Sequence, residues 1–213
     1  SFLDKSLLEV KIFSTLFKNS SVYDPYWSVL PMVITPFVFT YGKEVHPTAY
    51  IMVALIELWG LRLTLNWAIR FKGLKHEDWR YTKYREKYPK MFPLINLFGI
   101  HMMPTIIVYL LMLAPIEYFD TVNNGLMTDQ FNVSTIIAIL ISLFAIIIEC
   151  IADAQSSYYR KKYPNKILDK GLWKVSRHPN YFGEIVFWFG LYLILISINS
   201  TMWILFLGPL VNL

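Results

Sequence analysis

The sequence lacks the residues from which several common functional sites are built. It has one cysteine, Cys150, among 213 residues, which excludes an internal disulfide and a cysteine-based metal cluster. Its four histidines are scattered and form no HExxH pair, so we expect no metal site. Its nine glycines form neither GxGxxG nor the P-loop pattern. A nucleotide would therefore have to be held by something other than a Rossmann turn or a P-loop.

Charge is scarce in this chain, and apolar side chains are abundant. Hydrophobic residues make up 55% of it and charged residues 16%, with a mean hydropathy of +0.42. These values do not fit a water-soluble domain and are typical of membrane proteins. No repeat or low-complexity linker divides the chain. We therefore predict a single domain over residues 1–213, an all-α, multi-pass transmembrane helical bundle.

Six apolar segments are candidates for membrane spans. A spanning helix needs about 20 mostly apolar residues. The predicted spans are 26–42, 48–69, 93–116, 132–152, 181–197 and 199–213, of which the first, fifth and sixth are short. Pro31 and Pro36 are expected to kink the first span, because an internal proline removes a helix hydrogen bond. The last two spans form a predicted hairpin.

The basic residues are concentrated on one predicted side of the membrane. Residues 70–90 hold eight lysines and arginines, residues 160–177 hold seven, and residues 1–25 hold three. The loop 117–131 has three acidic residues and no basic one. The positive-inside rule places the basic loops and the N-terminus on the cytoplasmic or equivalent side. Attraction to anionic headgroups accounts for the basic excess, so membrane lipids are expected partners and nucleic acid is not.

The first segment of the chain has a different pattern. Leu3, Leu7, Val10 and Phe17 fall on one helical face, and the charged residues lie mostly elsewhere. This pattern predicts an interfacial helix within residues 1–22, ahead of a bundle formed by the rest of the chain. The segment is too charged for a span and lacks the layout of a cleavable signal peptide. Because the sequence begins with serine, we expect further residues upstream.

Ionisable residues at membrane depth mark candidate sites, because lipid does not solvate charge. Arg62 lies in the second predicted span, and a fixed guanidinium suits a phosphate or carboxylate. Glu57 in the same span is equally consistent with a structural ion pair. Glu149 and Asp153 close the fourth span one helical turn apart, so their carboxylates point the same way. With Arg160, two turns further on, they form a predicted polar rim that opens toward the second basic loop.

Three motifs together resemble a known family. They are Leu58-Trp-Gly-Leu-Arg62, Glu77-Asp-Trp-Arg-Tyr81 and Gly171-Leu-Trp-Lys-Val-Ser-Arg-His-Pro-Asn-Tyr-Phe-Gly-Glu184. In this order they resemble the motifs of the steroid 5-alpha-reductase-like membrane proteins, in the subgroup known as DUF1295. The similarity extends from about Asp24 to the chain end. The Arg-His-Pro-x-Tyr core alone is shared with sterol reductases and with isoprenylcysteine and phospholipid methyltransferases.

The resemblance implies a helical membrane fold with NADPH in a cytoplasm-facing cavity. Arginines suit the phosphates, and Asn180 and Glu184 suit the ribose or the nicotinamide amide. The cofactor-binding residues expected from the matching positions are Arg62, Arg70, Asp153, Arg160, Arg177, His178, Asn180, Tyr181 and Glu184. We accordingly predict a polar cavity bounded by residues of this set, opening between the two basic loops.

The chain departs from the family pattern where steroid reductases activate the substrate carbonyl. Those enzymes carry a Gln-Glu pair before a Leu-Pro, and a tyrosine in the next span. Here Ser28-Val29 precede Leu30-Pro31, and Trp59 stands at the tyrosine position, so neither group can protonate an enolate. The basic C-terminal tail of the family does not follow Leu213.

These observations predict an NADPH-dependent membrane oxidoreductase that reduces a carbon–carbon double bond of a sterol-like or other lipid enone. A polar group would polarise the carbonyl, and the candidates are Asp24, Tyr26, Glu57 and His101. Two alternatives stay open. A methyltransferase would use the Arg-His-Pro-Asn-Tyr turn to hold S-adenosylmethionine. A non-catalytic structural subunit would keep the fold within an assembly of other membrane subunits.

Overall fold

The computed structural model describes residues 19–40, 46–125, 131–164 and 166–212. Within these ranges the chain is helical and contains no strand, which confirms the all-α prediction. Of the predicted interfacial segment 1–22, residues 1–18 lie outside the described residues. The described part of that segment forms a short 3₁₀-helix, η1, at Ser20–Tyr23.

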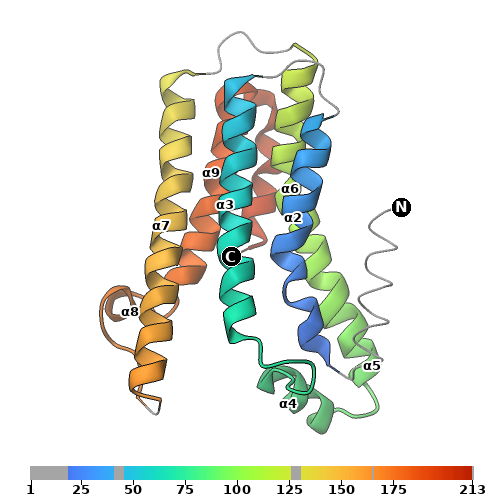
Figure 1. Cartoon of the computed structure of the whole chain (residues 1–213). Coiled ribbons are helices and arrows are strands. Elements are labelled where there is room, and N and C mark those ends of the chain that lie inside the picture. Colours follow the sequence, from blue (N-terminus) through green and yellow to red (C-terminus); the bar gives the residue numbers. More distant parts are fainter. Residues whose placement is uncertain (1–18, 41–45, 126–130, 165, 213) are drawn as a thin grey trace.

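The remaining elements follow in an up-and-down order (Figure 1). They are α2 (Tyr26–Thr40), α3 (Pro47–Arg70), α4 (Trp79–Lys87), α5 (Phe92–Leu94), the π-helix η2 (Ile95–Met102), α6 (Met103–Asn123), α7 (Val133–Lys162), α8 (Leu172–Val175), α9 (Pro179–Ile198), the 3₁₀-helix η3 (Ser200–Phe206) and α10 (Leu207–Leu210). Proline opens α3 and α9 at their first positions, where the missing N–H removes no helix bond.

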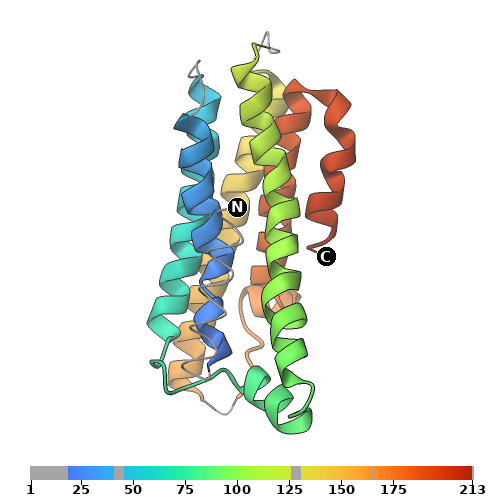
Figure 2. The same ribbon diagram turned by 90° about the vertical axis from the view of Figure 1, so that its right-hand side faces the viewer.

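Four helical rods are long and apolar enough to cross a membrane, namely α3, Phe92–Asn123, α7 and α9. The chain is therefore a multi-pass membrane protein, as predicted. The other two predicted spans are shorter in the described residues: α2 has 15 residues, and Ser200–Leu210 is a short apolar helix. Figure 2 shows this last segment folded back beside α9 and ending part-way along the bundle. A full crossing takes about 20 residues, and four helices among the described residues meet that length and composition.

Small residues bring α7 and α9 close together. A methyl group added at Gly183 of α9 would meet Glu149 Cγ and would lie 3.1 Å from the Ala145 carbonyl oxygen. One added at Gly190 would meet Ser142 of α7 in the same way. Small residues at helix contacts let membrane helices approach closely. The spacing of Gly183 and Gly190 along α9 therefore determines which face of α7 packs against α9. This face carries Glu149.

Both basic segments lie at one end of the bundle. Figure 1 shows α4 and α8 together at the lower end, opposite the connection between α6 and α7. Their shared end agrees with the charge pattern of the sequence. The long rod from α5 to α6 begins near this end and contains the π-helical turns of η2. Such wide turns are rare and occur frequently at functional sites.

Candidate functional site

Arg62 of α3 is the centre of a cluster of charged side chains from three helices. Its Nη1 donates to Asp153 Oδ2 at 2.7 Å. Its Nη2 lies 3.3 Å from Glu149 Oε2 and 3.8 Å from Glu184 Oε2. Asp153 and Glu149 lie one turn apart on α7, and Glu184 lies on α9. We name these four residues the Arg62 cluster; it joins residues that are far apart in the sequence.

Two tryptophans hold the carboxylate of Glu184. Trp59 Nε1 donates to Glu184 Oε2 at 3.0 Å, and Trp188 Nε1 donates to Glu184 Oε1 at 2.9 Å. Both indoles are buried, and the Trp59 ring stacks on Phe187 with centroids 5.3 Å apart. Trp59 is thus an N–H donor in an aromatic layer between α3 and α9. This role was not predicted, and the signal for it in the sequence is the presence of tryptophans at membrane depth.

Arg70 extends the cluster toward the basic end of the bundle. Its Nη2 lies 3.9 Å from Asp153 Oδ1 and donates to Ser157 Oγ at 3.3 Å. Its side chain is 42% exposed, against 11% for Arg62. Arg160 is exposed and lies on α7 two turns beyond Asp153. Arg70 and Arg160 are thus placed near the C-terminal ends of α3 and α7.

Other predicted cofactor residues lie around α8 and the start of α9. Asn180 is half-buried, and its Oδ1 atom is buried without a hydrogen-bond partner among the described residues. The rings of His178 and Tyr181 stack at 5.1 Å, and both residues are exposed, as is Arg177. None of the contacts in the described part of the chain joins His178, Tyr181 or Arg177 to the Arg62 cluster.

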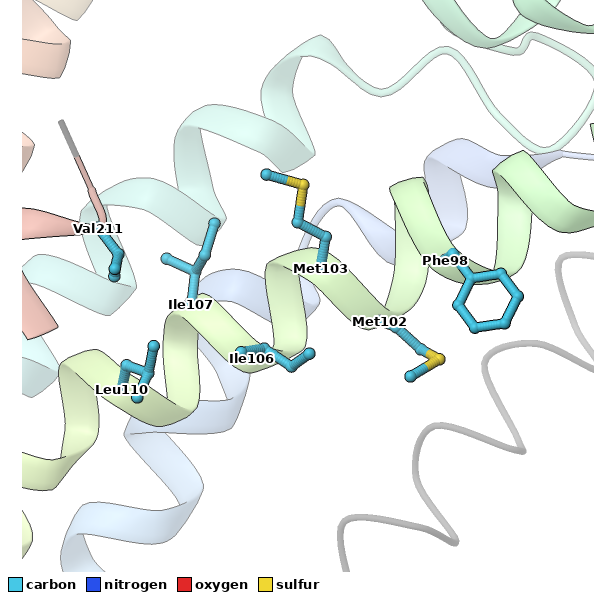
Figure 3. A pocket seen from close by; sticks show the side chains of 7 residues that line it. All are labelled: Phe98, Met102, Met103, Ile106, Ile107, Leu110 and Val211. Atoms are coloured by element: carbon cyan, nitrogen blue, oxygen red, sulfur yellow. The ribbon is translucent and has the colours of Figure 1, made fainter.

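At the position of the predicted polar cavity, Arg62 contacts Asp153 and Glu184 directly. Two hollows among the described residues lie away from this cluster. One, of about 570 Å³, lies against α4 and the loop before it, between Lys75 and Glu86. The other, of about 460 Å³, runs along η2 and α6 and is shown in Figure 3. It is lined by Phe98, Met102, Met103, Ile106, Ile107, Leu110 and Val211, all of them apolar.

Two of the predicted polarising residues, Tyr26 of α2 and His101 of η2, both lie against Tyr23 of η1. The Tyr23 ring lies 4.9 Å from the Tyr26 ring and 4.8 Å from the His101 ring. The Tyr23 hydroxyl donates to the backbone oxygen of His101 at 3.0 Å. His101 Nδ1 is 2.6 Å from the backbone oxygen of Asn96. Tyr23, which the sequence analysis did not single out, is thus the residue that joins Tyr26 to His101.

Glu57, the third of the predicted polarising residues, lies on α3 and is half-buried. Its Oε1 atom is buried without a hydrogen-bond partner in the described part of the chain. It is five residues from Arg62, and the ion pairs of Arg62 go to other helices. The structure therefore does not pair Glu57 with Arg62.

The fourth, Asp24, belongs to a set of contacts that fastens the first described residues to the loop before α4. Asn19 Nδ2 donates to the backbone oxygen of Leu74 at 2.8 Å. We name this set the N-terminal clasp; its other bonds run from the Ser20 N–H to Glu77 Oε1 (2.8 Å), from the Asp78 N–H to Ser21 Oγ (2.8 Å) and from the Tyr81 hydroxyl to Asp24 Oδ1 (2.7 Å). The Glu77–Tyr81 motif is therefore a docking element for residues 19–24.

The electrostatics of the clasp follow from its partial burial. Burial raises the pKa of the Asp24 carboxyl to about 6, and the Tyr81 hydrogen bond and the nearby Arg80 charge oppose that rise. Burial and the Asp24 carboxylate raise the pKa of the Tyr81 hydroxyl. Glu77 accepts from Arg85 at 2.8 Å as well as from Ser20. Within the clasp, Asp24 is therefore stabilised by the Tyr81 hydroxyl and the Arg80 charge, and Glu77 by Arg85.

The described residues contain no group of three histidine, cysteine or acidic side chains placed to hold a metal ion. The carboxylates of the Arg62 cluster instead surround a guanidinium. What the fold and this site define is a multi-pass helical membrane protein with a buried ion-pair cluster between its spans.

Comparison with known proteins assigns the family. The family model described as "Protein of unknown function (DUF1295)" matches residues 11–213, and the chain belongs to that family. It is similar to the "Uncharacterized protein C594.04c" of Schizosaccharomyces pombe, with 30% identity over 202 aligned residues. The alignment covers 83% of this chain and 57% of that protein, so the chain spans just over half the length of this relative. No solved structure matches.

Proposed function

We propose that this protein is an NADPH-dependent membrane oxidoreductase of the steroid 5-alpha-reductase-like type, reducing a carbon–carbon double bond of a lipid enone. One observation carries the proposal. Arg62, Arg70, Asp153 and Glu184, which the motifs assign to the cofactor, come from three helices and meet in one place. That place opens toward the basic end of the bundle, which we assign to the cytoplasmic side.

The residues present fit the parts of a dinucleotide. Arg70 and Arg160 lie near the C-terminal ends of α3 and α7, and guanidiniums favour a bound phosphate. The buried Oδ1 of Asn180 has no hydrogen-bond partner among the described residues and can accept from an amide or a hydroxyl. The carboxylate of Asp153 can accept from a ribose hydroxyl. The phosphates of a dinucleotide therefore fit the exposed edge of the site, and its amide and hydroxyl donors fit Asn180 and Asp153 in the interior.

When bound, the dinucleotide supplies the hydride of the reduction. The residues of this chain bind and orient it: Arg70 and Arg160 hold the phosphates, and Asn180 positions the amide. The aromatic layer of Trp59, Phe187 and Trp188 excludes water from the end that reacts. The exposed apolar faces of the long helices lie against lipid, which suits a substrate that arrives through the bilayer.

One observation favours a second candidate, a non-catalytic structural subunit. The side chains of the Arg62 cluster are already paired with one another. A cluster of this kind can hold three helices together without any cofactor. The binding experiment below separates the two functions.

The test is nucleotide binding to the purified protein in detergent, with NADPH, NADH and S-adenosylmethionine as ligands. Arg160→Gln should weaken NADPH binding by about 10- to 150-fold, because a charge-assisted phosphate contact contributes about 1.5–3 kcal/mol. Lys161→Gln, which removes a neighbouring exposed charge, is the matched control and should leave the affinity near that of the wild type. Binding of S-adenosylmethionine alone would support a methyltransferase. A folded protein that binds none of the three would support the structural subunit.

A further inference from the structure

The Arg62 cluster contains more acid than base. Three carboxylates contact Arg62, and a second guanidinium, Arg70, reaches only the outer oxygen of Asp153. The side chain of Glu149 is 1% exposed and that of Asp153 11%. With every carboxylate ionised, the group would carry one uncompensated negative charge inside the membrane. Burial of an unpaired charge is strongly unfavourable, and such groups change protonation instead.

The favourable contacts are unequally shared among the three acids. Asp153 lies 2.7 Å from one guanidinium and 3.9 Å from the other. Glu184 accepts an indole N–H on each of its oxygens. Glu149 Oε2 has no hydrogen-bond partner among the described residues and lies 3.3 Å from an Arg62 nitrogen that Glu184 also approaches. Glu149 is therefore the acid whose ionised form is least stabilised.

The surroundings of Glu149 supply no further counter-charge. On α9, Gly183 packs against its Cγ, and Glu184 Oε2 lies 3.8 Å from the same Arg62 nitrogen that Glu149 approaches. The helix α8 approaches α7 through the Trp173 indole, which donates to the backbone oxygen of Ala152. The charged groups that face Glu149 are thus Arg62 from α3, Glu184 from α9 and Asp153 from its own helix. In the described residues these acids are not arranged to hold a metal ion.

We propose that the Arg62 cluster binds one proton, carried by Glu149 and shared with Glu184. With Glu149 neutral, two carboxylates face two guanidiniums, and the charges balance. The Glu149 O–H then donates to the Glu184 carboxylate, which gives the otherwise unpartnered acid a hydrogen bond. This proton-binding site exists in the protein without any nucleotide.

A use for this proton follows from the proposed function and rests on it. Reduction of an enone adds one hydride and one proton, and the family's usual proton donors are replaced here by Val29 and Trp59. A proton leaving Glu149 would leave a carboxylate beside Arg62, and water at the basic end would return the proton. The experiment below tests proton binding on nucleotide-free protein, so its outcome is separate from that of the nucleotide titration.

The experiment is infrared spectroscopy of the full chain in lipid or detergent. A neutral carboxylic acid has a carbonyl stretching band that is distinct from those of carboxylates and amides. The wild-type protein at neutral pH should show this band, and Glu149→Gln, which keeps the shape and removes the acid, should remove the contribution of Glu149 to it. Glu57→Gln is the matched control, because Glu57 is a partly buried glutamate of α3, and that variant should keep the contribution of Glu149. Absence of the band in the wild type, or an undiminished band in Glu149→Gln, would overturn the proposal.

A second variant keeps the test decisive if Glu149→Gln does not fold. Asp153→Asn removes one negative charge while Glu149 stays in place. The band should then disappear at a pH lower by about one unit or more, because a like charge nearby disfavours ionisation. If the pH at which half of the band is lost were unchanged or higher in Asp153→Asn, the negative charge of Asp153 would not be what keeps the proton on Glu149.

Discussion

Charged side chains are buried away from water in two places, the Arg62 cluster and the N-terminal clasp. The contacts that hold them differ between the two. In the Arg62 cluster, side chains from three spans meet one another, with Arg62 as the shared partner. In the N-terminal clasp, most bonds join a side chain to a backbone group at the end of the bundle, as when Asn19 donates to Leu74. A clasp of this kind consists of separable bonds, each contributing about 0.5–1.5 kcal/mol. The cluster depends on one residue, and its members cannot be removed independently.

The largest effect is expected when the common partner of the cluster is removed. Arg62→Gln leaves the Asp153 carboxylate buried without its nearer counter-charge and removes the cation beside Glu149. Loss of one partner of a buried ion pair costs about 3–5 kcal/mol. We expect a fall of this size in the free energy of unfolding, measured by circular dichroism in detergent. Arg70→Gln removes a more exposed guanidinium and should cost less than about 1 kcal/mol. Equal losses in the two variants would show that the cluster is not centred on Arg62.

A smaller effect is expected when the cluster is disturbed through packing alone. Gly183→Ala places a methyl group against Glu149 Cγ and near the Ala145 carbonyl, and overpacking of this kind costs about 1–3 kcal/mol. The thermal unfolding temperature in detergent should fall, and Glu149 should shift relative to Arg62. Gly99→Ala is the matched control, because its added methyl would lie 3.9 Å from the Ile95 side chain, an ordinary contact. If Gly99→Ala were the more damaging change, the close approach of α7 and α9 would not position Glu149.

The smallest effect is expected at the clasp, as a dependence of stability on pH. The pKa of Asp24 is raised in the folded protein to about 6 from an ordinary value of 3.8. The folded state therefore holds this proton more tightly than the unfolded state. Its contribution to stability is fully present below about pH 4 and is lost as the pH rises to about 6. Unfolding in denaturant across this range should show the slope, and Asp24→Asn should remove it.

Removal of the Tyr81 hydroxyl is a second test of the same pH dependence of stability. It donates to Asp24 at 2.7 Å and holds the pKa of that carboxyl lower than burial alone would place it. Tyr81→Phe should therefore extend the loss of stability to higher pH, with a further cost of about 0.5–1.5 kcal/mol for the missing bond. A pH profile identical to that of the wild type would mean that Asp24 is not held by Tyr81.

The sequence predicted those features that depend on local order. Apolar length placed α3, α7 and α9, and the one-turn spacing of Glu149 and Asp153 placed both carboxylates on one face. Composition could not separate a full span from the short 3₁₀ and α-helical turns of residues 200–210, because both are apolar.

Partners far apart in the chain were the other features that the sequence could not supply. Trp59 and Glu184 are 125 residues apart, and Tyr81 and Asp24 are 57 apart. Each pair consists of ordinary residue types whose contact depends on how the helices pack. The motifs predicted that Arg62, Asp153 and Glu184 would lie near one another, and they do. The motifs did not predict that these residues would contact each other directly rather than line an open cavity.

The π-helical turns of η2 have a consequence for how this rod can vary among relatives. A π-turn closes its hydrogen bonds over five residues instead of four, so it accommodates one residue more than an α-helix of the same height. The helix on either side keeps its own register, which directs His101 toward Tyr23 while Met102 and Met103 line the apolar hollow. Deletion of one residue between Ile95 and Met102 can thus be absorbed by conversion to ordinary α-helix. Homologous chains that differ by a single-residue gap within this stretch would share the same bundle above and below it.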